Sequence, residues 1–280
     1  MNAISIGPFV FSHDRFIAVL TIFAFVLAIE ILARRRREIG DAIRFWGNIA
    51  LVVWIIGARL GFVWTHWEAF APDPWTVFAI WQGGFDIYAG VFAVGVALFA
   101  AFLARPRAGG PVLIAVTVAA LAFVTSTLLL PNEAQGRIPA AGFADLTGAP
   151  VSLAQRDGQP LVLNLWATWC PPCRREMPMM VDVAGSQDAV DVVFANQGER
   201  AETIRDFLNT AGLPPDGMVR DPNNALMQEF ELQGLPSTLF FAADGSLKAV
   251  HTGEISRAAL LAGIEDLKRS GGGGQRATQE

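Results

Sequence analysis

Long apolar stretches dominate the first half of the chain, whereas short apolar runs separated by polar segments make up the second half. Four stretches are each close to the ~20 residues that an α-helix needs to cross a bilayer. They cover residues 16–32, 43–64, 85–103 and 111–130. The pattern therefore predicts an all-α membrane domain of four transmembrane helices within residues 1–133.

Arginines are unevenly distributed between the loops that join these stretches. Residues 34–37 are four arginines after the first stretch, and Arg105 and Arg107 follow the third. The alternate loop, residues 65–76, contains no Lys or Arg. Because loops rich in Lys and Arg stay in the cytoplasm, we expect a multi-pass protein of the bacterial inner membrane with both termini on the periplasmic side.

The pattern changes after residue 133 to alternating strands and helices, which is typical of an α/β domain. We expect this domain to cover residues 134–270 and a disordered, glycine-rich tail to cover residues 271–280. Asp244-Gly245 suits a hairpin turn between the last two strands. The expected strands are residues 161–166, 190–195, 238–242 and 247–251, and the expected helices are residues 201–211, 223–230 and 257–267.

Composition excludes several classes of function. A hydrophobic content of 52% with 17% charged residues is too apolar for one soluble domain, and a net charge of −5 does not suggest nucleic-acid binding. Only two cysteines occur, Cys170 and Cys173, and the three histidines are scattered. This is no disulfide framework, and we expect no metal site. A zinc site shared between two chains is the remaining alternative, since a closed site takes four ligands.

Cys170 and Cys173 lie where the apolar run 161–166 gives way to a helical pattern. A helix N-terminus stabilises a thiolate through its free N–H groups and its dipole, and Arg174 and Arg175 add positive charge. We therefore expect Cys170 to attack a substrate disulfide and Cys173 to resolve the mixed disulfide that forms. The alternative is a pair of buried structural cysteines.

The segment from Asn164 to Pro178 resembles the active-site segment of the TlpA/ResA family of thioredoxin-like reductases, and the similarity extends over residues 136–267. The resemblance implies a thioredoxin-like fold and a redox-active disulfide between Cys170 and Cys173, with no other cofactor. It also implies protein disulfides as substrates, of the kind handled in cytochrome c maturation or copper-site assembly.

Further residues take their roles from this resemblance. Glu176 matches an acidic residue that tunes or relays protons for the cysteines, with a solvated helix acid as the alternative. Pro236 matches the cis-proline that packs beside the disulfide. Asn164 stands where thioredoxins proper carry a buried acid, so proton handling must rest elsewhere. The residues implied to contact the substrate are Trp169, Pro171, Pro172 and Leu235.

Met177, Met179 and Met180 lie close to the cysteines in the sequence. Soft sulfur ligands suit Cu(I), which makes copper binding an alternative. Methionine is also a common gap-filler in protein cores, and we favour that interpretation.

The first half resembles the N-terminal part of prolipoprotein diacylglyceryl transferase over residues 4–107. Where that family has His-Gly-Gly, this chain has Tyr88-Ala89-Gly90, and Asp14 replaces a tyrosine. The later helices with the family's essential arginines are absent, so we expect no lipid transfer. The matching segments are residues 4–8, 57–62, 73–74 and 81–85.

Arg59 and Asp86 are charges inside apolar stretches, near the outer face of the membrane, where they are costly unless paired or functional. We expect them to pair with each other, with a lipid-headgroup site as the alternative. No cysteine lies in any stretch, so the chain needs a separate electron donor, which the TlpA/ResA resemblance implies to be a membrane reductase of the DsbD or CcdA type. The leading hypothesis is therefore a reductase anchored in the phospholipid bilayer, and the alternatives are a lipid-transfer protein and a non-catalytic scaffold.

Overall fold

The computed structural model describes residues 3–6, 9–130, 136–155 and 158–272. The helices of the first half form one compact unit, His13–Asn132, and the C-terminal half forms another. A short antiparallel hairpin precedes the helices, and it is grouped with the C-terminal unit. Its strands are β1 (Ala3–Ile6) and β2 (Phe9–Ser12).

Four helices of the first unit are long and apolar enough to span a membrane, which confirms the four predicted stretches. The fourth begins at Pro106 rather than at residue 111, because a proline fits the first helical turn, where its missing N–H is not needed. The helices are α1 (His13–Arg35), α2 (Gly40–Thr65), α4 (Ile87–Ala104) and α5 (Pro106–Leu129).

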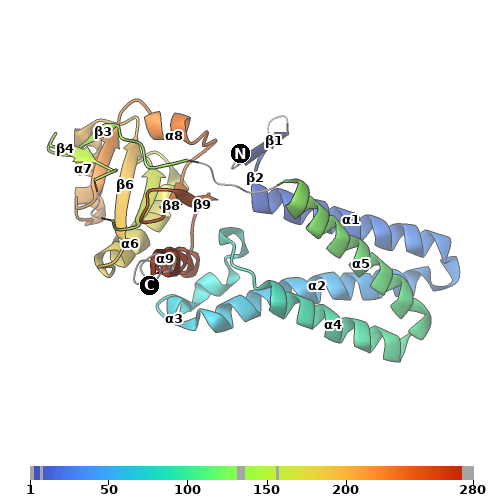
Figure 1. Cartoon of the computed structure of the whole chain (residues 1–280). Helices are drawn as coiled ribbons and strands as arrows, with labels where there is room; N and C mark the ends of the chain where they lie inside the picture. Colours follow the sequence, from blue (N-terminus) through green and yellow to red (C-terminus); the bar gives the residue numbers. More distant parts are fainter. Residues whose placement is uncertain (1–2, 7–8, 131–135, 156–157, 273–280) are drawn as a thin grey trace, which may run out of the picture. The chain divides into compact units, whose positions relative to one another are not determined.

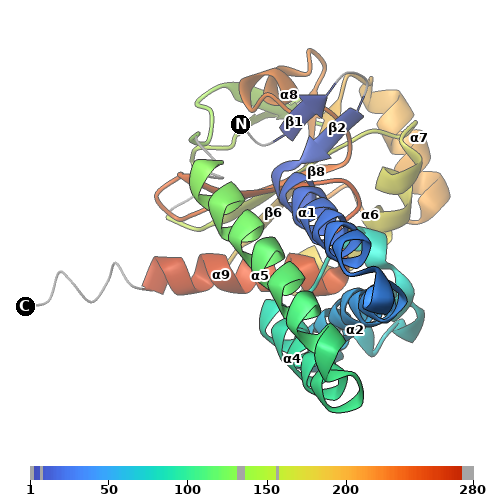
Figure 2. The same ribbon diagram turned by 90° about the vertical axis from the view of Figure 1, so that its right-hand side faces the viewer.

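Within this unit α1 lies beside α5, and α2 lies beside α4, as both views show (Figure 1 and Figure 2). Small residues bring α2 and α4 together. A Cβ added to Gly57 would lie 2.5 Å from the Cβ of Ala93, and one added to Gly61 would lie 2.2 Å from that of Ala89. Such close backbone approach is typical of helix pairs in membranes.

The loop between α2 and α4 is held by Arg59, which is buried in α2. Its guanidinium lies over the ring of Phe70, in the short helix α3 (Trp67–Phe70). It also donates hydrogen bonds of 2.6 to 3.0 Å to four backbone carbonyl oxygens. These belong to Thr76, Val77, Gly83 and Gly84, in and around the turns η2 (Pro74–Phe78) and η3 (Ile80–Gln82).

Asp86 caps a helix instead of forming the ion pair that we expected from the sequence. Its carboxylate accepts a hydrogen bond of 2.8 Å from the backbone N–H of Ala89 and so caps the start of α4. The expected ion pair with Arg59 is therefore not formed in the described part of the chain. Carbonyl dipoles satisfy the arginine, and the free N–H groups of a helix start satisfy the aspartate.

The C-terminal unit is built on a seven-stranded sheet of order β4-β3-β7-β6-β5-β8-β9. Neighbours within β7-β6-β5 are parallel and all other pairs are antiparallel. The predicted strands are β5 (Leu161–Trp166), β6 (Asp191–Gln197), β8 (Ser237–Phe241) and β9 (Leu247–Thr252), which confirms them within two residues. The strands missed are β3 (Gly142–Asp145), β4 (Pro150–Ser152) and β7 (Met218–Asp221).

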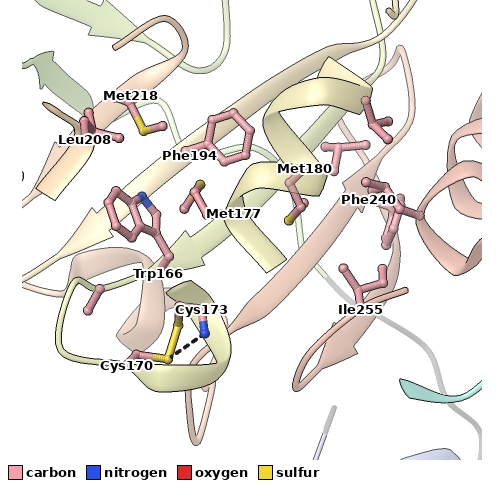
Figure 3. Packing of buried hydrophobic residues seen from close by; sticks show 14 of the residues in the cluster. Trp166, Cys170, Cys173, Met177, Met180, Phe194, Leu208, Met218, Phe240 and Ile255 are labelled. Atoms are coloured by element: carbon pink, nitrogen blue, oxygen red, sulfur yellow. Dashed lines mark hydrogen bonds between the residues drawn. A yellow bond between two sulfur atoms is a disulfide. The ribbon is translucent and has the colours of Figure 1, made fainter. Parts of the chain in front are cut away.

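Four helices accompany this sheet, α6 (Pro171–Gly185), α7 (Ala201–Ala211), α8 (Ala225–Glu229) and α9 (Arg257–Gly272). The last helix continues through Gly271 and Gly272, so the predicted tail is wrong for these two residues, and its remainder lies outside the described residues. An apolar cluster of α6, α7 and α9 covers one face of the sheet (Figure 3), while a second cluster with α8 covers the other.

The alternation along β5 decides which of its side chains face α6. Val162 and Trp166 belong to the cluster with α6, whereas Leu161, Leu163 and Leu165 belong to the cluster with α8. Every residue of β5 is buried, as expected for a central strand. The chain leaves this strand at Trp166 and begins α6 only a few residues later, so the first turn of α6 lies close to the C-terminal end of this central strand.

Candidate functional site

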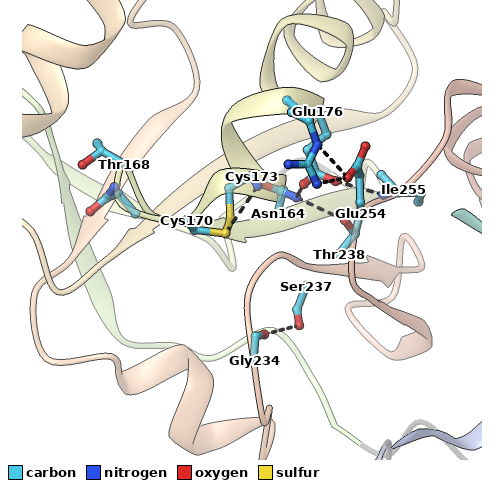
Figure 4. The surroundings of a disulfide bond; sticks show 12 residues. Asn164, Thr168, Cys170, Cys173, Glu176, Gly234, Ser237, Thr238, Glu254 and Ile255 are labelled. Atoms are coloured by element: carbon cyan, nitrogen blue, oxygen red, sulfur yellow. Dashed lines mark hydrogen bonds and ion pairs between the residues drawn. A yellow bond between two sulfur atoms is a disulfide. The ribbon is translucent and has the colours of Figure 1, made fainter. Parts of the chain in front are cut away.

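The two cysteines are joined by a disulfide at the start of α6 (Figure 4). Cys170 is the residue that caps the helix, and its Sγ accepts a hydrogen bond of 3.3 Å from the backbone N–H of Cys173. Pro171 and Pro172 occupy the first helical positions, where a missing N–H costs little. Cys170 is 3% exposed and Cys173 is fully buried, so Cys170 is the cysteine that retains some exposed surface.

This position gives Cys170 the chemistry of a nucleophile. After reduction of the disulfide, its sulfur faces the free N–H groups and the positive end of the dipole of α6, both of which stabilise a thiolate. Cys173 is held three residues away on the same turn, within reach for re-forming the disulfide. The pair can therefore cycle between disulfide and dithiol without rearranging the domain.

A carboxylate that sequence reasoning did not identify holds the loop before Cys170. Glu199 follows β6, the strand that pairs in parallel with β5. Its carboxylate accepts hydrogen bonds from the backbone N–H of Thr168 at 2.7 Å and from the Thr168 hydroxyl at 2.5 Å. Asn196 donates a third, at 2.8 Å. The sequence signal that could have identified Glu199 is its position just after β6, the strand that pairs with β5.

Glu176 is buried beneath the disulfide, with 3% of its surface exposed. One carboxylate oxygen accepts a hydrogen bond of 3.0 Å from the Asn164 amide, and the other accepts one of 2.9 Å from the backbone N–H of Ile255. Burial raises the pKa of Glu176 to about 7, against the lowering effect of these two hydrogen bonds. The alternative of a solvated helix acid is therefore wrong, while the part that Glu176 plays in proton transfer stays a prediction.

The Leu235–Pro236 peptide bond is cis, as the family resemblance implied. Pro236 immediately precedes β8, which pairs with β5, and its carbonyl oxygen accepts a hydrogen bond of 2.8 Å from Gly253. Leu235 is partly buried and packs against the core clusters of both faces. Their contact with a substrate stays a prediction.

The predicted substrate-contacting residues around the disulfide differ in exposure. Trp169 is 67% exposed, Pro171 is also exposed, and Pro172 is half-buried. An indole on the surface beside a disulfide offers a substrate chain an apolar contact.

The two arginines of α6 have different partners. Arg175 forms an ion pair of 2.7 Å with Glu254, the residue before Ile255, so the loop after β9 is tied to α6 at two points. Arg174 instead lies over the ring of Phe207 in α7, 5.7 Å from its centroid. Both arginines keep exposed positive charge next to the first turn of α6.

The methionines that suggested copper lie in the core. Met177 and Met180 are fully buried in the cluster under α6, and Met179 is partly buried against it. Figure 3 shows Met177 and Met180 among the apolar side chains that fill the space between α6 and the sheet. Their positions are those of packing residues.

Comparison with known proteins gives two family matches, which overlap over residues 133–158. The redoxin model matches residues 133–265, and the prolipoprotein diacylglyceryl transferase model matches residues 2–158, which is more than half of the chain. The chain therefore belongs to the prolipoprotein diacylglyceryl transferase family, and its second half matches the redoxin model. We call these parts the transferase-like domain and the redoxin domain.

Relatives of the redoxin domain are thiol-disulfide proteins. The chain is 32% identical over 111 residues to the thiol-disulfide oxidoreductase ResA of Halalkalibacterium halodurans, which covers 39% of this chain and 62% of the relative. It is 30% identical over 99 residues to the thiol:disulfide interchange protein DsbE of Vibrio cholerae, covering 35% and 53%. The chain thus spans less than two thirds of either relative.

Solved structures are similar to a little under half of the chain. A thioredoxin-family thiol:disulfide interchange protein from Chlorobium tepidum has a TM-score of 0.43 and 24% identity, covering 49% of this chain and 98% of that one. A secreted disulfide oxidoreductase of Mycobacterium tuberculosis has a TM-score of 0.42 and 25% identity, covering 46% and 96%. The redoxin domain itself consists of a mixed sheet with helices on both faces.

Proposed function

We propose that this protein is a membrane-anchored thiol-disulfide oxidoreductase that reduces protein disulfides outside the cytoplasm through Cys170 and Cys173. The observation that carries the proposal is the disulfide at the N-terminus of α6. The redoxin match and the named relatives support the same class of reaction. No metal or organic cofactor is needed for it, because the two sulfurs carry the electrons.

The reduced pair would react in two steps. The Cys170 thiolate attacks one sulfur of a substrate disulfide, forming a mixed disulfide and releasing the other substrate sulfur as a thiolate that takes up a proton. The Cys173 thiol then loses its proton and attacks Cys170 Sγ, which releases the second substrate thiolate and re-forms the Cys170–Cys173 disulfide. Two electrons pass from the protein to the substrate.

Glu176 is the group best placed to accept the proton that Cys173 loses. It lies one helical turn beyond Cys173 on α6, buried and with a pKa of about 7. A carboxylate with such a pKa can take up and release protons near neutral pH. Asn164, which donates to it, fixes the orientation of the carboxylate.

Renewed reduction of the disulfide needs an electron donor, because the apolar helices contain no cysteine. We propose a membrane dithiol reductase of the DsbD or CcdA type. The arginine-rich loops at the ends of α1 and α4 support an orientation with the redoxin domain in the periplasm or its equivalent. Cytochrome c maturation or copper-site assembly would supply targets in that compartment.

Insulin reduction by the full chain in detergent micelles tests the proposed activity. The wild-type protein with dithiothreitol should precipitate insulin faster than dithiothreitol alone, and Cys170→Ser should abolish the difference. A native sequence with no activity would favour a non-catalytic scaffold instead. Fusing alkaline phosphatase or a fluorescent protein after Glu280 tests the orientation, since only the former should be active.

A further inference from the structure

A groove beside the disulfide is not used in the reaction steps above. It has a volume of about 400 Å³ and lies between the first turn of α6 and the C-terminal part of α7. Its lining combines apolar and cationic side chains on one surface, within one domain. The lining residues are Pro171, Arg174, Arg175, Phe207 and Ala211.

The floor of the groove packs against the core of the domain. Phe207 rests on Trp166 from the end of β5, with ring centroids 5.5 Å apart, and Trp166 is fully buried in the core. The guanidinium of Arg174 stacks over the same Phe207 ring. The apolar and cationic parts of the groove are therefore positioned before any ligand arrives.

The two arginines of the groove differ in whether a carboxylate neutralises their charge. Arg175 is paired with Glu254 at 2.7 Å. Within the described residues Arg174 contacts an aromatic ring and no carboxylate, and it is exposed. The N-terminus of α6 adds positive potential on the same side. An anionic group on a partner could therefore pair with Arg174.

The groove is also within reach of a substrate bound at Cys170. Pro171 follows Cys170 directly. Arg174 lies about one helical turn after Cys170, which is about 6 Å along the axis of α6. An extended peptide advances roughly 3.3 Å per residue. A substrate residue two or three positions from its own cysteine can therefore enter the groove while the mixed disulfide forms.

We propose that this groove selects substrates in which an Asp or Glu stands two or three residues from the target cysteine, next to an apolar side chain. The acid pairs with Arg174, and the apolar side chain packs on Phe207. The inference rests on the proposed oxidoreductase function and adds the class of protein substrate. Arg174 and Phe207 are then specificity-determining residues of the redoxin domain.

Synthetic peptides with one disulfide test this selection, using the reduced full chain in detergent micelles at low ionic strength. The peptides carry Glu, Gln or Lys three residues from the cysteine and are otherwise identical. We expect Glu to react about threefold faster than Gln, the scale of one exposed ion pair, and Lys to react slowest. Added salt should reduce the preference.

Variants locate the effect within the groove. Arg174→Gln should remove the preference for Glu over Gln, and Phe207→Ala should lower the rate for both peptides when the apolar neighbour is present. Arg257→Gln is the matched control, since Arg257 lies on α9, pairs with Asp182 and does not line the groove. It changes the net charge equally and should keep the preference.

Insulin reduction, measured in parallel, separates the two levels of the proposal. If insulin is reduced and the Glu, Gln and Lys peptides react at the same rate, the groove does not select acidic substrates. The same conclusion follows if Arg257→Gln removes the preference as fully as Arg174→Gln, because general electrostatic attraction then accounts for it. If neither insulin nor any peptide is reduced, the oxidoreductase function itself fails.

Discussion

Glu199 accepts hydrogen bonds from both donors of Thr168, its backbone N–H at 2.7 Å and its hydroxyl at 2.5 Å. Thr168 stands two residues before Cys170, in the loop that joins β5 to α6. The Glu199 carboxylate, just after β6, therefore holds the loop that follows the neighbouring parallel strand β5. The segment that leads to Cys170 is thus held in place by a contact from outside the segment.

Loss of this contact should destabilise the redoxin domain and slow its reaction. Thr168→Val removes the hydroxyl but keeps the backbone N–H, and should cost about 2 kcal/mol, the scale of a hydrogen bond to a charged group. Thr168→Ser keeps both donors and serves as the control. Thermal unfolding of the oxidised chain in micelles measures the effect, and equal stability of the Val and Ser variants would contradict it.

Glu176 should make the stability of the oxidised protein depend on pH. Its pKa is about 7 in the folded domain and ordinarily 4.5, so the folded state binds the proton more tightly. The contribution to stability is complete below pH 4.5 and is lost as pH rises through 7. The upper limit of this loss is roughly 3 kcal/mol.

The measurement compares wild type with Glu176→Gln, whose side chain does not titrate. Between pH 5 and 8 the wild type should lose more stability than the variant, with both proteins in the disulfide form so that no thiol contributes. Glu202→Gln, an exposed position on α7, should behave as wild type. Parallel pH profiles for wild type and Glu176→Gln would show that Glu176 does not carry the effect.

Sequence patterns predicted the elements that are long or strongly apolar, namely the four membrane-type helices and the buried strands β5 and β8. They missed β1, β2, β3, β4 and β7, because strands of three or four residues carry too little alternation to be recognised. The cysteines, by contrast, were placed correctly at the start of α6, since the four consecutive residues Cys-Pro-Pro-Cys are enough to indicate this position.

Contacts between residues far apart in sequence were harder to predict. Glu199 was missed because its partner Thr168 lies 31 residues away and becomes a neighbour only when β5 and β6 pair. Glu176 likewise accepts a hydrogen bond from the backbone N–H of Ile255, 79 residues away. Such pairings are properties of the sheet topology, which periodicity does not specify.

The two cysteines should differ in reactivity once reduced. Cys170 caps α6 and its sulfur accepts an N–H, whereas Cys173 is fully buried. At pH 7 iodoacetamide should therefore modify Cys173→Ser at least about tenfold faster than Cys170→Ser, as for other thiols at helix N-termini. Mass spectrometry of quenched samples gives both rates, and the denatured variants, which should react alike, provide the control. Equal rates in the folded variants would remove Cys170 from its role.

Arg59 should be more important to the transferase-like domain than Asp86. Arg59 donates to four loop carbonyls that no other side chain in the described residues is shown to satisfy, so Arg59→Gln leaves several of them without donors. Asp86→Asn retains a good capping oxygen for the N–H of Ala89 and should cost only a few tenths of a kcal/mol. Thermal unfolding in micelles should therefore show a large loss for Arg59→Gln and a small one for Asp86→Asn. Two equal losses, with recovery in the double variant Arg59→Gln/Asp86→Asn, would instead reveal that the two charges act as a pair.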